Sequence, residues 1–286
     1  MPIDPSVAVG ADLGEVTFSW TPREVALYNL TVGGAQDPMD TVGLQYIDDV
    51  APKVLPSFAT VAASFNATEA PKVEFPGVDI DLAKVVHGSQ QVRVHRPLPA
   101  SGTATTRTKI AEVQDKGSAA VIVQESTTVD EAGQPLWTAR SSIFAKGEGG
   151  FGGDRGTSTR VDLPDRAADH EILVPTQPGQ ALLYRLCGDR NPLHSDPAFA
   201  AAAGFPRPIL HGLCTYGSVA RAVVDEIFGG DVAALADYGV SFAGVVFPGE
   251  TLRVRAWEDG DRLLAATTIV DRDDAPALGN VVFIKS

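Results

Sequence analysis

Apolar residues repeat with a helical period in one segment of the chain and form short runs in others. After Gly212 they recur at every third or fourth position, at Leu213, Tyr216, Val219, Val223 and Ile227. This spacing predicts an amphipathic helix that ends at Gly229-Gly230. Beyond it, apolar runs between Gly, Pro and Asp turns predict strands at 240–242, 252–256, 263–270 and 281–284.

The first half of the chain has a similar pattern. Four further runs predict strands at 91–95, 104–113, 119–125 and 136–144. Each half therefore has a helical part followed by strands. A long helix beside an antiparallel sheet indicates an α+β fold in which the helix packs on the sheet.

The two halves also resemble each other residue by residue. Three pairs of segments match in the same order: 22–30 with 178–186, 54–60 with 209–215, and 92–103 with 240–251. Tyr28 and Tyr184, in the first pair, are 156 positions apart. Three weak matches in one order indicate a duplicated unit of roughly 130–150 residues.

A glycine-rich segment separates the halves. Six of the eleven residues in 146–156 are glycine, which disfavours both a helix and a central strand. We interpret it as the start of a linker. The predicted organisation is a first unit at 1–147, a linker at 148–170 and a second unit at 171–286.

Composition and charge narrow the class of protein. The formal net charge of -13 argues against nucleic acid or an anionic membrane as the main partner. No apolar run is long enough for a membrane-spanning helix, and the N-terminus lacks the pattern of a secretory signal. Cys187 and Cys214 have no metal-type spacing, so a disulfide framework is not expected. We predict a cytoplasmic protein.

The candidate chemistry is concentrated in 184–197. Asp196-Pro197 has the residues of a helix start before the alanine-rich 198–203, so His194 is expected on the preceding loop. Together with Asp189, it could hold a water and move a proton to or from it. From the residues alone, Asp189 and Asn191 could equally cap a turn while His194 fills a polar niche.

A second motif, His211-Gly212, stands directly before the predicted long helix. Glycine allows close approach of a substrate, and the free amides of a helix start favour negative charge on a ligand. An ordinary glycine helix start is the simpler interpretation. A metal site of Asp189, His194 and His211 is disfavoured because the histidines lack a compact ligand spacing, and we expect no metal.

These residues resemble a known family. Tyr184 to His194, with Cys187-Gly188-Asp189 and Asn191-Pro192-Leu193-His194, is similar to the signature of the hydratase 2 family, the MaoC-like dehydratases. The downstream 210–217 resembles that family's second motif. The resemblance covers nearly the whole chain and implies two tandem hot-dog units, a degenerate N-terminal one and a catalytic C-terminal one.

The resemblance also implies an activity and roles for residues. It implies reversible hydration of trans-2-enoyl-CoA to (R)-3-hydroxyacyl-CoA in fatty-acid metabolism. Asp189 and His194 would activate the water, Asn191 would orient it, and the Gly212 amide would hold the thioester oxygen. The implied substrate-binding residues are His87, Gly88, Lys116, Arg190, Pro192, Leu193 and Phe242. Lys116 could equally be an ordinary exposed turn residue.

The first unit's counterparts of the catalytic groups are different residues. Asp40 stands where the second unit has His194, and Pro56-Ser57 where it has His211-Gly212. The resemblance implies that the first unit accommodates a long acyl chain instead. It implies no cofactor, because coenzyme A is part of the substrate. It further implies a homodimer.

Two other functions stay open at this level. The first is a dehydratase of (R)-3-hydroxyacyl chains on acyl carrier protein, which runs the same reaction in reverse. The second is an acyl-thioester-binding module without turnover. The proton-transfer groups Asp189 and His194 argue against the binding module, since a binder would not need them. A thioesterase would share the fold, but no residue favours it.

Overall fold

The computed structural model describes residues 3–65, 67, 74–80, 85–157 and 160–286. The strands of the first half are β1 (Asp12–Trp20), β2 (Val85–Val94), β3 (Gly102–Asp115), β4 (Ala119–Asp130) and β5 (Pro135–Lys146). Those of the second half are β6 (His170–Pro175), β7 (Leu235–Phe242), β8 (Thr251–Asp259), β9 (Arg262–Ile269) and β10 (Ala275–Lys285).

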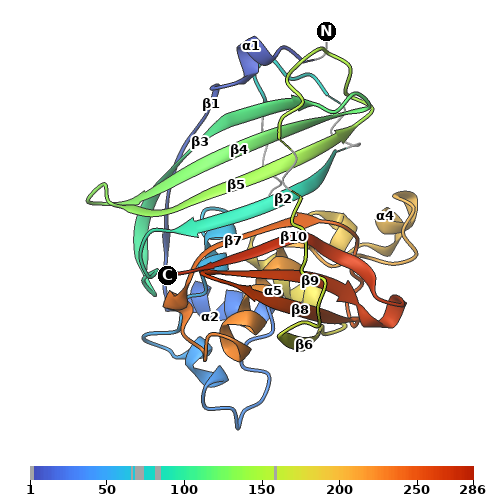
Figure 1. Ribbon diagram of the computed structural model, residues 1–286. Coiled ribbons are helices and arrows are strands. Elements are labelled where there is room, and N and C mark those ends of the chain that lie inside the picture. Colours follow the sequence, from blue (N-terminus) through green and yellow to red (C-terminus); the bar gives the residue numbers. More distant parts are fainter. Residues whose placement is uncertain (1–2, 66, 68–73, 81–84, 158–159) are drawn as a thin grey trace.

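Within the described ranges these ten strands form one antiparallel sheet in the order β1-β3-β4-β5-β2-β7-β10-β9-β8-β6. The halves meet where β2 pairs with β7, with Gln91 opposite Gly239 and Val92 opposite Tyr238. In Figure 1 the first half forms the upper part of the sheet and the second half the lower part. The duplication seen in the sequence is therefore a duplication of sheets joined edge to edge.

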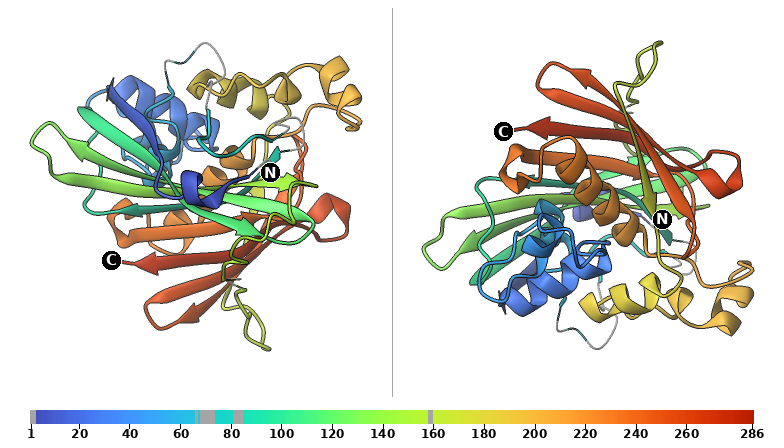
Figure 2. Two further views of the ribbon diagram at one scale, coloured as in Figure 1. Left: turned by 90° about the horizontal axis from the view of Figure 1, so that it is seen from above. Right: turned by 90° about the horizontal axis from the view of Figure 1, so that it is seen from below.

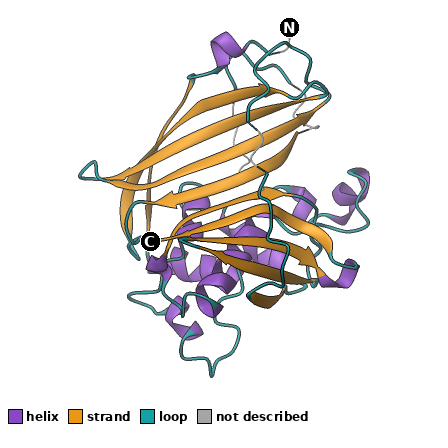
Figure 3. Ribbon diagram, viewed as in Figure 1, coloured by secondary structure: helices purple, strands orange, loops and turns teal. Residues whose placement is uncertain are grey.

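The longer helices gather on one face of the sheet (Figures 2 and 3). The α-helices are α1 (Pro5–Ala8), α2 (Pro22–Thr31), α3 (Gln180–Tyr184), α4 (Pro197–Ala202) and α5 (Gly212–Glu226). The 3-10 helices are η1 (Gly43–Ile47), η2 (Pro56–Thr60), η4 (Arg185–Cys187), η5 (Pro192–His194), η6 (Val232–Ala234) and η7 (Val270–Arg272). The predicted cap of α4 is confirmed, because the Asp196 side chain accepts from the amides of Ala198 and Phe199.

The predicted long helix is α5, and it lies in the centre of the molecule. The Tyr216 ring stacks on Tyr238 of β7 with centroids 4.2 Å apart, and its hydroxyl donates to the Tyr238 carbonyl at 2.9 Å. On another side, α2 passes so close that a Cβ on Gly217 would lie 2.5 Å from the Tyr28 hydroxyl. Burial on several sides makes α5 the scaffold on which both halves pack.

The two halves differ in the segments 54–60 and 209–215, whose sequences match each other. In the second half this segment opens α5, but in the first half it forms only η2, with Pro56 at its first position. Tyr28 and Tyr184 keep equivalent places: both are fully buried, and their ring centroids are 6.4 Å apart. The framework is thus repeated, while the long helix of the second half has a much shorter counterpart.

All the predicted strands are present, and two more occur at the edges of the sheet. β1 is exposed along most of its length, and β6 is short. An edge strand is paired on one side only and needs less apolar surface, so its sequence signal is weak. Among the described residues, no helix has the length and apolar character needed to cross a membrane.

The glycine-rich segment after β5 is held by one carboxylate. Asp115, at the end of β3, accepts from the amides of Gly117, Gly150 and Gly152 at 2.7–2.8 Å. These bonds hold the pKa of Asp115 at about 2, below its ordinary value. Gly150 and Gly152 have φ near +80°, which glycine adopts without strain. Within the predicted linker, residues 158–159 lie outside the described residues.

Candidate active site

The loop that carries the candidate residues is fixed by Gly188. This residue follows η4 with a φ of 113°, a conformation that favours glycine. A Cβ there would also overlap the backbone carbonyl oxygen of Ser64, which belongs to the first half. The first half therefore sets the position from which Asp189 projects.

Asp189 and Asn191 do cap turns, as the simpler interpretation of the sequence proposed. Asp189 Oδ1 accepts from the Asn191 amide at 3.1 Å, and Asn191 Oδ1 accepts from the Leu193 amide at 3.0 Å. Capping uses one oxygen of the Asp189 carboxylate, whose side chain is exposed. Its other oxygen remains available for a ligand, so capping and chemistry are compatible here.

His194 is buried, and its ring orientation is defined. Its Nδ1 lies 2.9 Å from the carbonyl oxygen of Ile209. Because a carbonyl only accepts, Nδ1 carries the proton, and Nε2 of the neutral ring is an unprotonated acceptor. Burial lowers the pKa of His194, although the Ile209 carbonyl and Asp189 partly oppose this shift. The ring is therefore a neutral base in the tautomer that leaves Nε2 free.

His211, the residue before α5, lies against His194. The two rings stack with centroids 3.7 Å apart and planes 27° apart. Burial, followed by the neighbouring His194, lowers the pKa of His211 to about 3. Among the described residues, potential ligand atoms of Asp189, His194 and His211 lie within 4.8 Å of one another. The sequence motifs thus converge on one place.

This cluster does not fit a metal ion. A tetrahedral ion must lie in the plane of each imidazole that binds it, at about 2.0–2.1 Å from the nitrogen. Rings stacked face to face with planes 27° apart share such a point only far from either ring. His194 Nδ1 is also committed to the Ile209 carbonyl. The stacked arrangement suits proton transfer better than chelation.

Gly212 is the first residue of α5, so its N–H has no partner within the helix. A Cβ at this position would lie 3.0 Å from the ring of Phe242, at the end of β7. The amide is therefore reached through a narrow space beside an aromatic ring. Such a donor suits an oxygen that gains negative charge.

His87 reaches the same space because of a bulge in β2. The pairing of β2 with β5 shifts between His87 and Ser89, at Gly88. Because one extra residue reverses the alternation of side chains, His87 lies on the helix side beside Phe242, with ring centroids 4.6 Å apart. Burial lowers the pKa of His87 to about 4, and nearby Asp189 opposes the shift. His87 and Phe242 thus border the cluster, and Gly88 provides the bulge that places His87 there.

The other predicted binding residues are less closely placed. Arg190, Pro192 and Leu193 belong to the same loop as Asp189; Arg190 and Leu193 are half-buried and Pro192 is exposed. Lys116 lies in the turn between β3 and β4, where its amine donates to the Arg155 carbonyl. Among the described residues, no hydrogen bond or ion pair joins Lys116 to the cluster.

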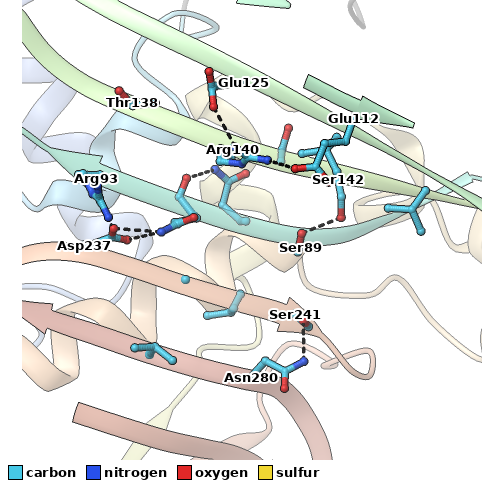
Figure 4. Close-up of a pocket in the computed structure, with 18 of the residues that line it drawn as sticks. Ser89, Arg93, Glu112, Glu125, Thr138, Arg140, Ser142, Asp237, Ser241 and Asn280 are labelled. Carbon is cyan, nitrogen blue, oxygen red and sulfur yellow. Dashed lines mark hydrogen bonds and ion pairs between the residues drawn. The ribbon is translucent and has the colours of Figure 1, made fainter. Parts of the chain in front are cut away.

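A cavity of about 720 Å³ lies elsewhere, along the seam between β2 and β7. Figure 4 shows its polar lining: Arg140 bridges Glu112 and Glu125, and Asp237 faces Arg93. Gln91 and Arg93 line it, while the intervening Val92 is in the core, so it opens on the face away from the helices. Its charges are paired with one another, which indicates a structural network.

Sequence reasoning undervalued two residues of the site. His211 was considered for its position beside Gly212 and as a disfavoured metal ligand, not as a partner for the His194 ring. Ser64 carried no signal, because its contribution is a backbone carbonyl beneath Gly188. Gly188 itself was the one indication in the sequence that another backbone segment lies against this loop, since glycine often marks close backbone approach.

The fold is a double hot-dog, because the sheet is duplicated and surrounds a central helix. Its site resembles that of an enzyme, because a carboxylate and histidines cluster beside the start of that helix. Family comparisons agree: residues 18–147 match the MFE-2 hydratase 2 N-terminal domain, and residues 160–275 match the MaoC like domain. A Mycobacterium tuberculosis protein described as a double hotdog fold has a TM-score of 0.55 at 14% identity, covering 100% of this chain and 99% of that one.

Closer relatives are similar over the full length. Enoyl-CoA hydratase ChsH3 of Mycobacterium tuberculosis is 54% identical, covering 99% of both chains. 3-Hydroxyacyl-thioester dehydratase Y of the same organism is 40% identical, covering 97% of this chain and 95% of that one. A MaoC-like dehydratase from Phytophthora capsici has a TM-score of 0.86 at 30% identity, covering 97% of this chain and 96% of that one.

The chain belongs to the MaoC-like dehydratase and hydratase 2 family. The relatives are named as hydratases and dehydratases, which add or remove water and are hydro-lyases. The chain is accordingly an enzyme of the hydro-lyase class. The alternative of a binding module without turnover is set aside.

Proposed function

We propose that this enzyme adds water reversibly to trans-2-enoyl-CoA to form (R)-3-hydroxyacyl-CoA. The observation that carries the proposal is the cluster of Asp189, His194 and His211, which holds His194 with Nε2 free and stands directly before the Gly212 start of α5. Ligand atoms less than 4.8 Å apart can share one water, because two hydrogen bonds of about 2.8 Å span that distance. The site thus holds a nucleophile beside an oxyanion donor.

The proposed reaction follows from these positions. His194 Nε2 takes a proton from the water as the water oxygen bonds to C3 of the enoyl group, and Asp189 accepts the other O–H. The electrons of the C2–C3 double bond move toward the thioester oxygen, which the Gly212 N–H stabilises. C2 of the enolate then takes that proton from His194 Nε2, which returns the ring to its neutral form. Asn191 orients Asp189 and the loop through its cap.

The surrounding residues suit a thioester with a long, anionic carrier. His87 and Phe242 border the space beside Gly212 and would line the acyl path. Arg190, with Pro192 and Leu193 on the same loop, would face the carrier end. Lys116 and Gly88 remain predicted binding residues. This acid–base chemistry requires no metal, nucleotide or flavin, and coenzyme A enters as part of the substrate.

The relatives support the reaction in both directions. One relative is named an enoyl-CoA hydratase and another a 3-hydroxyacyl-thioester dehydratase. Because hydration and dehydration share one transition state, the same site serves either. A carrier-protein thioester is therefore the second candidate substrate, and it differs in carrier recognition rather than in chemistry.

The test is the loss of enoyl absorbance when purified protein meets crotonyl-CoA or a long-chain enoyl-CoA. Asp189→Asn and His194→Ala are each expected to lower kcat by about 10²–10⁴-fold, the usual contribution of a positioned acid or base. Asp196→Asn is a matched control, because Asn can still cap α4. His95→Ala, at an exposed histidine on the first half, is the second control.

Each outcome has a definite meaning. Turnover of carrier-protein esters without turnover of either CoA ester would assign the elongation-type dehydratase instead. Full rates in both Asp189→Asn and His194→Ala would refute the proposed mechanism. Chiral analysis of the product tests the (R) configuration.

We also expect a homodimer in the cytoplasm, and both remain predictions. Cys187 and Cys214 are free and buried, which is compatible with a reducing compartment. Several relatives have names that include the word peroxisomal, however, so the cellular location of this protein has to be measured directly. Light scattering would give the oligomeric state.

A further inference from the structure

His211 has no part in the proposed proton transfer, yet it is among the most buried polar residues of the site. Its side chain is 1% exposed. One neighbour of its ring is His194, at 3.7 Å between centroids, and another is Tyr184, at 4.9 Å. A polar side chain so enclosed is costly unless it serves a purpose.

Hydrogen bonding does not account for its presence. His211 Nδ1 is buried without a partner among the described residues. Its Nε2 lies 3.4 Å from the Asp189 carbonyl oxygen, which is long for a hydrogen bond. The strongest contact of the ring is therefore its stack on His194.

The surroundings of His194 show what that stack does. Besides His211 itself, the charged and titratable groups around His194 come from four elements: Asp189 on the loop before η5, Tyr184 on α3, Arg185 on η4 and His87 on β2. Asp189 favours a protonated His194, whereas burial opposes it. His211 supplies part of that burial by covering one face of the ring. The two rings cannot both be protonated without a large cost, because two imidazolium ions at 3.7 Å would repel strongly.

We propose that His211 is a positioning residue: its neutral ring covers His194, excludes water from that face, and keeps Nε2 unprotonated and directed at the water site. The inference rests on the proposed function for its consequence in catalysis. The effect of the His211 ring on the proton affinity of His194 can be measured without turnover.

Two variants distinguish whether His211 acts by covering the His194 ring or by taking part in the reaction. His211→Phe keeps an aromatic ring against His194 and loses only the long contact to the Asp189 carbonyl. His211→Ala opens that face to water. Because burial is what lowers the pKa of His194, the Ala variant should raise this pKa toward its ordinary value near 6.5, and the Phe variant should leave it low. If the Ala variant does not fold, His211→Asn exposes the same face.

The first measurement is an imidazole nitrogen NMR titration of His194 between about pH 4 and pH 9. In the wild type and in His211→Phe, Nδ1 should remain the protonated nitrogen well below the ordinary midpoint. In His211→Ala the midpoint should move measurably upward, toward the ordinary value of a histidine. An unmoved midpoint in the Ala variant would overturn the proposal. This result stands even if the enzyme uses another substrate.

The second measurement is kcat/KM against pH with the substrate that the enzyme turns over. His211→Ala should move the acidic limb of kcat/KM to higher pH, so that activity on that limb falls below wild type and recovers as the pH rises. His211→Phe should stay within about threefold of wild type throughout. Equal loss in both variants at every pH, with no shift of the limb, would show that His211 takes part in the chemistry directly. A merely structural role would lower activity without moving the limb.

Discussion

The contact between Gly212 and Phe242 provides a sharp test of the proposed oxyanion donor. In Gly212→Ala, the new methyl group would lie 3.0 Å from Cε1 and 3.1 Å from Cδ1 of Phe242. Ordinary carbon contacts begin near 3.5 Å, so the two sides must separate by a few tenths of an ångström. The Phe242 ring cannot simply retreat, because His87 packs on it. The start of α5 is therefore expected to shift, and the amide with it.

The size of the effect follows from two opposing terms. Overpacking by one methyl group costs about 1 kcal/mol at the low end of its usual range. Replacing Gly by Ala where the backbone is compatible gains about 0.4–1 kcal/mol through the unfolded state. The free energy of unfolding should thus change little. Removing an oxyanion donor entirely costs about 10²–10³-fold in kcat, so displacing one should cost about 10–100-fold.

The assay combines kcat on the enoyl thioester with urea unfolding. Gly217→Ala is the control within the same helix, because its Cβ would clash with Tyr28 and Val32 rather than move the first amide. It should lower stability clearly and leave the kcat of the folded enzyme nearly unchanged. Adding Phe242→Val to Gly212→Ala should restore at least about fivefold of the lost rate, beyond the effect of Phe242→Val alone. Strict additivity would refute displacement by the ring.

Two further predictions concern the backbone and the linker. Gly188→Ala should lower the free energy of unfolding by at least about 2 kcal/mol in urea titration, because it combines a positive φ with overlap at Ser64. Gly204→Ala is the control, since Gly204 also has a positive φ but open space around it, and it should lower the free energy of unfolding less. Equal losses in the two variants would contradict the overlap at Ser64. Asp115→Asn should lower Tm at neutral pH. Since the folded pKa of Asp115 is about 2, below its unfolded value near 3.9, its stabilisation is present above the unfolded value and lost as pH falls toward 2. A Tm difference that does not shrink on acidification would be inconsistent with this.

Much of the architecture was predictable because it depends on local periodicity. The stripe that begins at Leu213 and Tyr216 predicted α5, and every predicted strand is present. The edge strands β1 and β6 were missed, since a strand paired on one side needs little apolar surface. The shortness of η2 was not predicted either. Its segment matches 209–215 in sequence, but Pro56 at its first position leads only into a single 3-10 turn.

The site was predictable where it depends on motifs and not where it depends on register or on contacts across the chain. Asp189, His194 and Gly212 could be expected at one site because the segments that carry them resemble two motifs of one family. The place of His87 could not be deduced, because strict alternation along β2 would put it on the same face as Ser89. The bulge at Gly88 reverses this and brings the ring to Phe242. The stack of His194 on His211 joins two motifs whose spacing says nothing about ring orientation.

Equivalent positions show how one framework carries the candidate site in one half alone. Tyr28 packs at 5.7 Å on Phe58, two residues beyond the Pro56 that matches His211, whereas Tyr184 packs on His211 itself at 4.9 Å. Asp40, the counterpart of His194, uses its carboxylate to cap the backbone at Val42. In the first half these positions therefore serve packing and turn formation. In the second half the ring of Tyr184 instead packs on His211, the residue before α5, and His211 stacks on His194, the proposed base.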